Sequence, residues 1–228
     1  MPLDASPNCA LCPAANQCIA LVQSHLSPAE TGRMLFTAND PATAIYVVRA
    51  GCVKSVTIDG EGNERVRSFH LPGDLIGLDA LGSDRYPASA IAVSPAQVCR
   101  VPKAAVMQKI VESPALARRL LERMSHDLAQ AQALAGDYNA DQRVAAFLLN
   151  MHERLRPMPR APARLPMSRG DIANHLRLAT ETVCRVLARF TAKGLIQSDD
   201  RKIRLLKTAP LQALAAPVGI THSQLLAA

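Results

Sequence analysis

The sequence lacks the features that would mark a membrane protein, a secreted protein or an enzyme. No apolar run approaches the ~20 residues that a membrane-spanning helix needs, and the N-terminus lacks the basic and then apolar segments of a signal peptide. The 6 histidines are scattered along the chain, and no nucleophile is grouped with a base. We therefore expect a cytoplasmic protein that is not an enzyme and has no membrane partner.

Charge is distributed unevenly along the 228 residues, which are enough for two modest domains. The net charge is +7, and residues 143–207 alone contain 14 Lys and Arg against 5 Asp and Glu. This basic C-terminal third follows a front part that is close to neutral, which indicates that the C-terminal part binds a polyanion. Charge by itself does not distinguish DNA from RNA or from an acidic protein.

Residues 167–196 predict two short helices joined by a tight connection at 177–179. Ser168 is a suitable N-cap, and Asp171 lies three residues later, as in a capping box. Thr180 opens the second helix. The apolar positions of this helix recur at helical spacing: Val183, Val186, Leu187 and Phe190.

The polar face of the second helix and the residues that follow it predict a winged helix-turn-helix that binds DNA. Gly194 ends the helix, a turn follows at 199–200, and residues 202–206 alternate like a wing strand. The candidate DNA-contacting residues are Ser168, Arg169, Thr180, Glu181, Thr182, Cys184, Arg185 and Arg189. A helical hairpin with a solvated charged face is the rival interpretation. Arg and Glu together near the start of the second helix, between basic flanks, favour DNA.

Three cysteines near the N-terminus form the pattern C-x2-C-x5-C: Cys9, Cys12 and Cys18. A disulfide framework is not expected, because nothing marks the chain as secreted. Thiols this close together in a cytosolic protein more often bind a metal or an iron–sulfur cluster, and either would need a fourth ligand. The other cysteines are Cys52, Cys99 and Cys184. Spacing does not choose among them, and a zinc site or an inert segment stays an alternative.

The middle of the chain predicts first strands and then long helices. The β-rich runs are 45–48, 52–58, 66–71, 88–93 and 97–101, with a hairpin turn at 59–63, which is typical of an all-β roll or barrel. A long helix is expected over 114–138, and an amphipathic helix over 139–155 with a hinge at 139–142.

The long helix carries an apolar stripe that suits a seam between two helices. The stripe includes Leu121, Met124, Leu128, Ala131 and Ala135. A helix that packs on its own β-roll would also need an apolar stripe. We favour a homodimer, because paired DNA-binding helices call for a two-fold protein.

The most specific resemblance to a known family begins at Arg169. The chain there reads R-G-D-I-x-N-x-L-x-L-x-x-E-T-V-x-R-x-L-x-R-F, which resembles the DNA-binding domain of the cyclic-AMP receptor and fumarate–nitrate regulator superfamily. The resemblance covers nearly the whole chain and implies an α+β fold. The implied parts are a β-roll sensor domain over 1–112, a dimerisation helix over 113–138 and a winged helix-turn-helix over 139–228.

The resemblance also implies a cofactor. Oxygen-sensing members of the fumarate–nitrate regulator branch carry the same N-terminal cysteine pattern, and their fourth ligand lies in a V-C-x-[IV]-P segment, which residues 98–102 match. The implied ligands of a [4Fe–4S] cluster, lost or converted when oxygen arrives, are Cys9, Cys12, Cys18 and Cys99. The segment between Cys18 and Leu35 is about a dozen residues shorter than the family pattern, which affects the expected geometry around the cluster more than the fold.

The function that the resemblance implies is a homodimeric transcription regulator, an activator, of anaerobic or microaerobic metabolism. It would bind double-stranded DNA at an inverted repeat similar to TTGAT–N4–ATCAA and contact RNA polymerase. Two alternatives stay open. The same regulator could use thiol oxidation at Cys52 or Cys184, or another ligand, in place of the cluster, or the chain could be an iron–sulfur electron-transfer protein.

A cyclic nucleotide is not expected as a ligand. The cyclic-AMP-binding branch holds the ribose with a Glu and the cyclic phosphate with an Arg-Ser pair. This chain has Leu78 at the first position and approximately Pro87 and Ala88 at the second, with Arg85 slightly out of place. A buried phosphate without a matched cation is costly.

Overall fold

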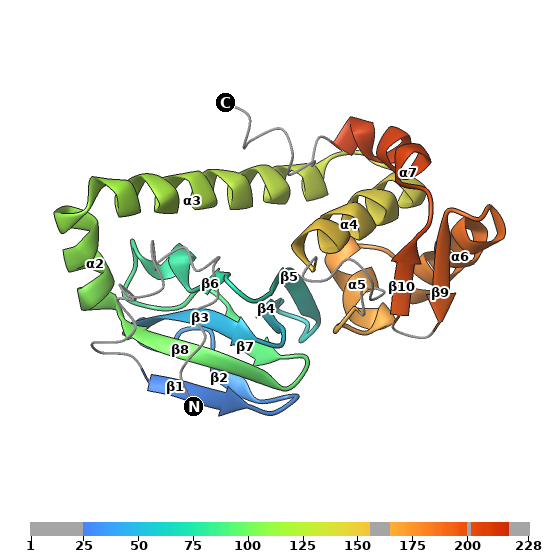
Figure 1. The fold of residues 1–228 in the computed structure, drawn as a ribbon. Coiled ribbons are helices and arrows are strands. Elements are labelled where there is room, and N and C mark those ends of the chain that lie inside the picture. Colours follow the sequence, from blue (N-terminus) through green and yellow to red (C-terminus); the bar gives the residue numbers. More distant parts are fainter. Residues whose placement is uncertain (1–24, 156–164, 200–201, 219–228) are drawn as a thin grey trace, which may run out of the picture. The chain divides into compact units, whose positions relative to one another are not determined.

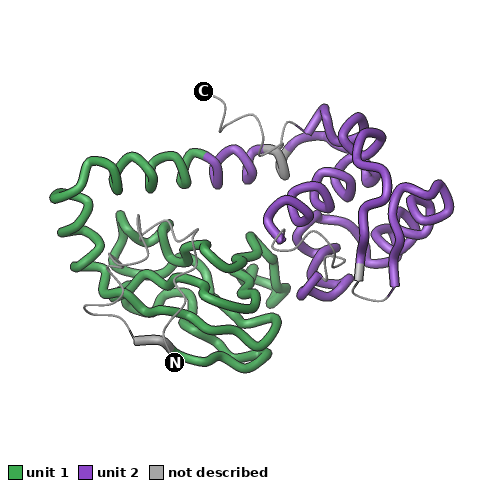
Figure 2. Tube along the Cα trace, in the orientation of Figure 1, with its two compact units in different colours: residues 1–125 green, residues 126–228 purple. Residues whose placement is uncertain are grey.

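The computed structural model describes residues 25–155, 165–199 and 202–218. The chain divides into two compact units, residues 1–125 and 126–228, whose boundary falls inside helix α3 (Pro114–Ala135) (Figure 2). The predicted ligands Cys9, Cys12 and Cys18 lie outside the described residues. The boundary leaves the predicted dimerisation helix divided between the two units.

The first unit is a β-roll made of two antiparallel sheets (Figure 1). One sheet has the strand order β1-β8-β3-β6 and the other β2-β7-β4-β5. The strands are β1 (His25–Ala29), β2 (Met34–Phe36), β3 (Ala44–Ala50), β4 (Val53–Ile58), β5 (Glu64–His70), β6 (Leu75–Ile76), β7 (Ser89–Ala92) and β8 (Ala96–Pro102). A short helix, η1 (Leu78–Ala80), follows β6, and helix α2 (Lys103–Glu112) follows β8 directly.

Two hydrophobic clusters form on opposite faces of β3 and β8, because successive side chains of a strand point to opposite sides. The first cluster joins the sheet to α2 and to the first half of α3: Ile45, Val47, Leu75, Leu78, Cys99, Val101, Val106, Leu116 and Leu120. The second lies between the sheets and includes Phe36, Val48, Val53, Ile76, Tyr86, Ala90 and Val98. The β-roll therefore fixes one face of α3 by burying Leu116 and Leu120.

The structure confirms the α+β class and the predicted β-rich runs, and it adds strands that the sequence did not predict. The predicted turn at 59–63 is present, and the Asp59 carboxylate accepts the N–H groups of Asn63 (2.8 Å) and Glu61 (3.0 Å). These bonds, led by that of Asn63, hold the pKa of Asp59 below its usual value. Strand β1 was missed because its sequence, HLSPA, contains a proline and no β-branched residue. It lies at a sheet edge, where proline is tolerated.

The second unit is built from helices and a two-stranded wing. Its elements are α4 (Ala140–Arg154), α5 (Arg169–Leu176), α6 (Thr180–Ala192), β9 (Ile196–Asp199), β10 (Lys202–Leu205), α7 (Thr208–Ala215) and η2 (Ala216–Val218). β9 and β10 pair in antiparallel fashion, as predicted for the wing. The apolar faces of α4, α5, α6 and α7 are buried together, with Val144, Leu176, Phe190 and Leu211 each at most 2% exposed.

The predicted hinge at 139–142 is wrong. The Asn139 side chain accepts the N–H of Gln142, and the Gln142 side chain accepts the N–H of Asn139, both at 3.0 Å. This reciprocal capping box makes Asn139 the N-cap of α4 and makes residues 140–142 its first turn. The long helix ends at Ala135 rather than at 138, so the non-helical connection between α3 and α4 is residues 136–139.

Candidate DNA-binding surface

Helix α5 begins as the sequence predicted and is tied to the wing. The Ser168 hydroxyl accepts the N–H of Asp171 at 3.0 Å, and the Asp171 carboxylate accepts the N–H of Ser168 at 3.2 Å, which completes a capping box. Arg169, the first residue of the helix, donates from its guanidinium to the Ser198 hydroxyl of β9 at 2.9 Å. The bond fixes the start of α5 against the wing, so both elements hold a defined position beside the recognition helix.

Helix α5 ends with a residue in the left-handed conformation. Arg177 has φ 56°, its N–H reaches the carbonyl of Asn174, and the N–H of Leu178 donates to the carbonyl of Ala173. These two bonds are the Schellman motif, in which glycine is the usual left-handed residue. A residue with a Cβ costs roughly 1–2 kcal/mol there. The turn into α6 therefore contains backbone strain at an arginine.

A second arginine holds this turn from inside the fold. The guanidinium of Arg143, on α4, donates to the carbonyls of Leu176 (3.0 Å), Gly136 (3.0 Å) and Tyr138 (2.9 Å). One side chain thus binds both the end of α5 and the connection between α3 and α4. The three carbonyls converge on one cation, so Arg143 ties residues 136–138 to the turn before α6.

Helix α6 has the two faces that the sequence predicted. Val183, Val186, Leu187 and Phe190 are buried, each at most 4% exposed. Thr180, Glu181, Cys184, Arg185 and Arg189 are exposed, and Thr182 is half-buried beneath Arg185, whose guanidinium lies 3.4 Å from its hydroxyl. The helix ends in a second Schellman motif with Gly194 at φ 63°. The exposed residues of the first two turns are those that a recognition helix presents to base edges.

Arg189 is exposed but already has an anionic partner. Its guanidinium forms an ion pair with Asp141, in the first turn of α4, and the two side chains are 47% and 28% exposed. The sequence predicted Arg189 as a contact to DNA, and this stays a prediction. A phosphate that binds Arg189 would compete with Asp141 or share the guanidinium with it.

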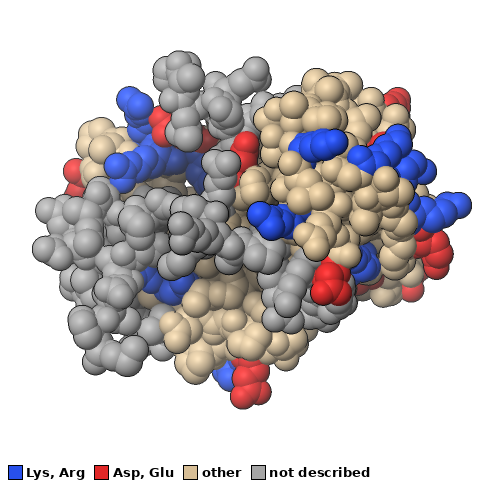
Figure 3. Space-filling model, turned by 45° about the vertical axis from the view of Figure 1, so that its right-hand side comes forward, with Lys and Arg blue, Asp and Glu red and all other residues tan. Residues whose placement is uncertain are grey.

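The exposed face of the second unit carries basic side chains. In Figure 3, which brings forward the side on which Figure 1 shows α6, Lys and Arg side chains stand among uncharged residues, with acidic side chains mostly near the margins. This distribution suits contact with the phosphates of a duplex.

Helix α3 exposes the stripe that was predicted to form a seam. Leu121, Met124 and Leu128 are 66%, 42% and 59% exposed. Ala131 is exposed as well, and the side chain of Ala135 lies outside the described part. The neighbouring face of the helix is buried through Leu116 and Leu120. The helix therefore packs on its own β-roll and also presents an apolar stripe to solvent, and the seam with a second helix stays a prediction.

The three cysteines in the described ranges differ in exposure. Cys99, on β8, is 8% exposed and faces the cluster that includes Leu116 and Leu120, and Cys52, just before β4, is fully buried. Cys184, on α6, is exposed. Within residues 25–155, 165–199 and 202–218, no three His, Cys, Asp or Glu side chains are grouped as a metal site would need.

Strand β1, the first described element of the chain, pairs with the strand that contains Cys99. In the antiparallel ladder of β1 and β8, Leu26 lies directly opposite Cys99 and His25 opposite Arg100. Cys18 precedes Leu26 by eight residues, which reach at most about 27 Å when fully extended. The pairing therefore places Leu26, eight residues after Cys18 in the sequence, directly opposite the buried Cys99. A soft thiolate donor at this place fits an iron–sulfur cluster.

The region where relatives of the cyclic-AMP-binding branch would hold a nucleotide is apolar here. Leu78 is 7% exposed and packs in the cluster with α2 and α3. The guanidinium of Arg85 donates to the carbonyl of Asn39, and the Tyr86 hydroxyl donates to the carbonyl of Ala44, both at 2.5 Å. Burial raises the pKa of Tyr86, so its phenol stays neutral.

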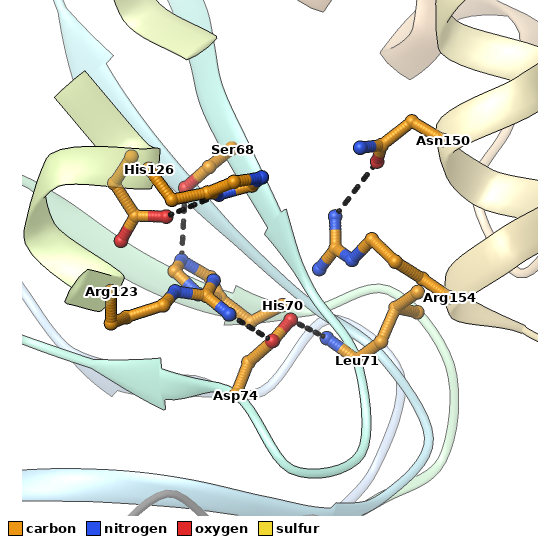
Figure 4. A network of polar contacts seen from close by, with 9 residues as sticks. Ser68, His70, Leu71, Asp74, Arg123, His126, Asn150 and Arg154 are labelled. Atoms are coloured by element: carbon orange, nitrogen blue, oxygen red, sulfur yellow. Dashed lines mark hydrogen bonds and ion pairs between the residues drawn. The ribbon is translucent and has the colours of Figure 1, made fainter. Parts of the chain in front are cut away.

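A polar network in the first unit escaped the sequence analysis. The Asp74 carboxylate accepts from the Arg123 guanidinium of α3 and from the N–H of Leu71, both at 2.7 Å, and nearby the Ser68 hydroxyl lies 3.0 Å from Nε2 of His70 (Figure 4). Asp74 is 7% exposed. The ion pair fastens α3 to the loop before β6. No local pattern announces such a pair, since its partners are 49 residues apart.

Comparison with known proteins agrees with the fold. Residues 27–113 match the cyclic nucleotide-binding domain, and residues 142–214 match the Crp-like helix-turn-helix domain. The solved structure of FixK2 from Bradyrhizobium japonicum superimposes with a TM-score of 0.77 at 29% identity, covering 85% of this chain and 98% of that one. A β-roll followed by a winged helix-turn-helix of this type defines a DNA-binding transcription regulator, not an enzyme.

Curated relatives identify the family more closely. The transcriptional activator protein anr of Pseudomonas aeruginosa is 36% identical over 193 residues, 82% of this chain and 79% of that protein. The fumarate and nitrate reduction regulatory protein of Escherichia coli is 35% identical over 193 residues, 82% of this chain and 77% of that protein. The chain belongs to the fumarate and nitrate reduction regulator family. None of the helices in its described part combines the length and apolar character that a membrane crossing requires.

Proposed function

We propose that this protein is a homodimeric transcription activator that holds an oxygen-sensitive [4Fe–4S] cluster through Cys9, Cys12, Cys18 and Cys99. It dimerises and binds its DNA sites when the cluster is in place. It acts in the cytoplasm and adjusts transcription to anaerobic or microaerobic conditions through contact with RNA polymerase. The proposal follows the names of its relatives, among which are fumarate and nitrate reduction regulatory proteins and an anaerobic regulatory protein.

The observation that carries the cluster assignment is the pairing of β1 with β8. It puts Leu26, eight residues after Cys18 in the sequence, opposite Cys99, whose thiol faces the side of the β-roll on which α3 packs. A cluster bound there would be the oxygen-sensitive group, because oxygen would remove or convert it. The residues of this chain do the rest, since Cys99 anchors the group on a rigid strand and the same apolar cluster includes Leu116 and Leu120 of α3.

The exposed stripe of α3 supports a dimer, and the exposed face of α6 supports sequence-specific readout. Leu121, Met124 and Leu128 are large apolar residues left in water, which a second copy of the helix would cover. On α6, Arg185 suits the O6 and N7 acceptors of guanine and Glu181 suits the N4 donor of cytosine. Guanine and cytosine both occur in an inverted repeat similar to TTGAT–N4–ATCAA, which we propose as the target.

A cyclic nucleotide is not the effector in this proposal. Leu78 fills its position with apolar surface, and Arg85, close in sequence to the second position, is exposed and bound to a backbone carbonyl. A ribose and a cyclic phosphate would need polar partners at both places.

Purification without oxygen tests the cluster. The expected protein is brown, with close to four iron and four sulfide per chain, because one cube binds through four thiolates. Cys99→Ser should lose the colour and the iron. The matched control is Cys52→Ser, which alters another buried thiol of the same unit and should stay brown. Circular dichroism of both variants separates loss of the cluster from loss of the fold.

Two outcomes would contradict this assignment. A colourless Cys52→Ser variant beside a brown Cys99→Ser variant would show that the fourth ligand is wrong. Thiol oxidation would be favoured instead if the wild-type protein contains no iron and loses DNA binding on treatment with peroxide, while the Cys184→Ser variant keeps DNA binding under the same treatment. Cys184 is the thiol for that alternative because it is exposed on α6, whereas Cys52 is buried.

A further inference from the structure

The helix-turn-helix contains two Schellman motifs with the same hydrogen bonds but different residues. At the end of α6 the left-handed residue is Gly194, at φ 63°, and at the end of α5 it is Arg177, at φ 56°. In each motif the residue after it donates to the carbonyl of the residue five positions earlier, Leu195 to Phe190 and Leu178 to Ala173, both at 2.9 Å. The chain uses the strain-free residue at one helix end and a strained one at the other.

The side chain of Arg177 makes no contact within the described residues that would offset the strain of its own backbone. The side chain is exposed, and among those residues its guanidinium makes no hydrogen bond or ion pair. Arg143 differs, since it donates to the Leu176 carbonyl at this turn and to two carbonyls of the connection between α3 and α4. The backbone conformation of the turn is thus held by other groups, and the Arg177 side chain is left free for a partner outside the chain. Observed strain of this kind points to a function.

We propose that Arg177 binds a backbone phosphate of the duplex and so positions the start of α6. It lies three residues before Thr180, in the exposed turn that leads into the face with Glu181 and Arg185. A guanidinium is always charged and matches the oxygens of a phosphate with two parallel N–H groups. A contact of this kind fixes register without reading sequence. The inference rests on DNA binding by the winged helix-turn-helix and does not depend on the cluster or on the proposed target repeat.

The test measures affinity of the full chain for a random-sequence 30-base-pair duplex between 0.05 and 1 M salt, about the range over which phosphate contacts are released. Each lost phosphate contact should flatten the slope of log K against log salt by about 0.9 per chain, which is roughly an eightfold loss at 0.1 M relative to 1 M. Arg177→Ala and Arg177→Gly should both show this loss. Arg177→Lys, which keeps the charge, should bind close to wild type.

Thermal unfolding supplies the second readout. Arg177→Gly removes the strain and should melt about 2–8 °C above Arg177→Ala. The two readouts therefore separate two properties. Affinity for DNA should depend on the charge of the side chain at position 177, and the melting temperature should depend on the backbone strain there. Arg65→Ala, which removes an exposed arginine of β5 in the first unit, controls for net charge and should leave the salt slope unchanged.

Three results would overturn the proposal. Wild-type affinity in both Arg177→Ala and Arg177→Gly would show that the side chain does not touch DNA. A lower melting temperature for Arg177→Ala with unchanged DNA affinity would show that the charge of Arg177 stabilises the C-terminus of α5 and does not bind DNA. Loss of affinity in Arg177→Ala but not in Arg177→Gly would assign the effect to the backbone. Arg185→Ala is the reference variant. If Arg185→Ala loses affinity for DNA while both Arg177 variants keep it, α6 binds DNA and Arg177 does not.

Discussion

An arginine of the first unit and two arginines of the second have opposite surroundings. In the first unit Arg123 reaches into the fold, is 25% exposed, and pairs with a carboxylate that is 10% exposed. In the second unit Arg177, in the turn before the recognition helix, and Arg185, on that helix, are exposed to solvent. The buried pair fastens α3 to the β-roll, and the exposed cations remain available for a polyanion. Arginine therefore supports architecture at Arg123 and is available for binding at Arg177 and Arg185, and its surroundings decide which.

Energetics explain the division. A charge removed from water is stabilising only when a partner and further hydrogen bonds replace its hydration, as the guanidinium and the Leu71 N–H do for Asp74. Exposed pairs contribute little to stability, so an exposed cation can exchange one anion for another at small cost. Arg143 is a third case, since it stabilises a turn through carbonyls alone.

The largest effect is expected from breaking the buried pair. Asp74→Asn keeps the size of the side chain and an acceptor for Leu71, but it leaves Arg123 without its charged partner. We expect a loss of about 2–3 kcal/mol in the free energy of unfolding, below the value for a fully buried pair because Arg123 is partly exposed. Urea unfolding checks this. Arg118→Ala, which breaks the exposed pair with Glu122 on the same helix, should change stability little. Equal effects from both changes would contradict the contrast.

A smaller effect is expected on the binding face. Glu181→Ala should cost about 1–3 kcal/mol in binding to the best DNA site and should relax one base position, because a direct base contact is lost. Arg189→Ala should weaken binding to all sequences alike and flatten the salt dependence, as loss of a phosphate contact does. Competition binding against a set of single-base variants distinguishes the two patterns. Sequence-blind losses from both changes would show that Glu181 does not read a base.

The smallest effect is expected from the partly exposed ion pair between Asp141 and Arg189. Asp141 holds Arg189, so Asp141→Asn should free the guanidinium for a phosphate. We expect tighter binding to every sequence, by less than about 1 kcal/mol because the pair is partly exposed, with a salt slope steeper by up to about 0.9. Salt titrations measure this, with Asp141→Glu as the control that keeps the charge. Weaker binding by Asp141→Asn would mean that Asp141 positions Arg189 for DNA rather than competing with DNA.

Local signals account for what could be predicted. The capping box of Ser168 and Asp171 and the helical spacing from Val183 to Phe190 are written within a few residues, and the structure has both. The hinge failed for a local reason as well, because Asn139 and Gln142 form a second capping box that the polar composition concealed. The cluster segment, Cys9 to Cys18, was assigned by its resemblance to a family and stays a prediction.

The sequence by itself determined the helix-turn-helix, its exposed face, the β-rich middle and the family. Tertiary structure decided which distant groups meet. The partners Asp74 and Arg123 are 49 residues apart, Asp141 and Arg189 are 48 apart, and Arg143 binds a carbonyl 33 residues away. Capping and periodicity depend on neighbours along the chain, so they can be read from it. An ion pair depends on how helices and sheets pack, and the left-handed backbone of Arg177 appears only when the turn around it has closed.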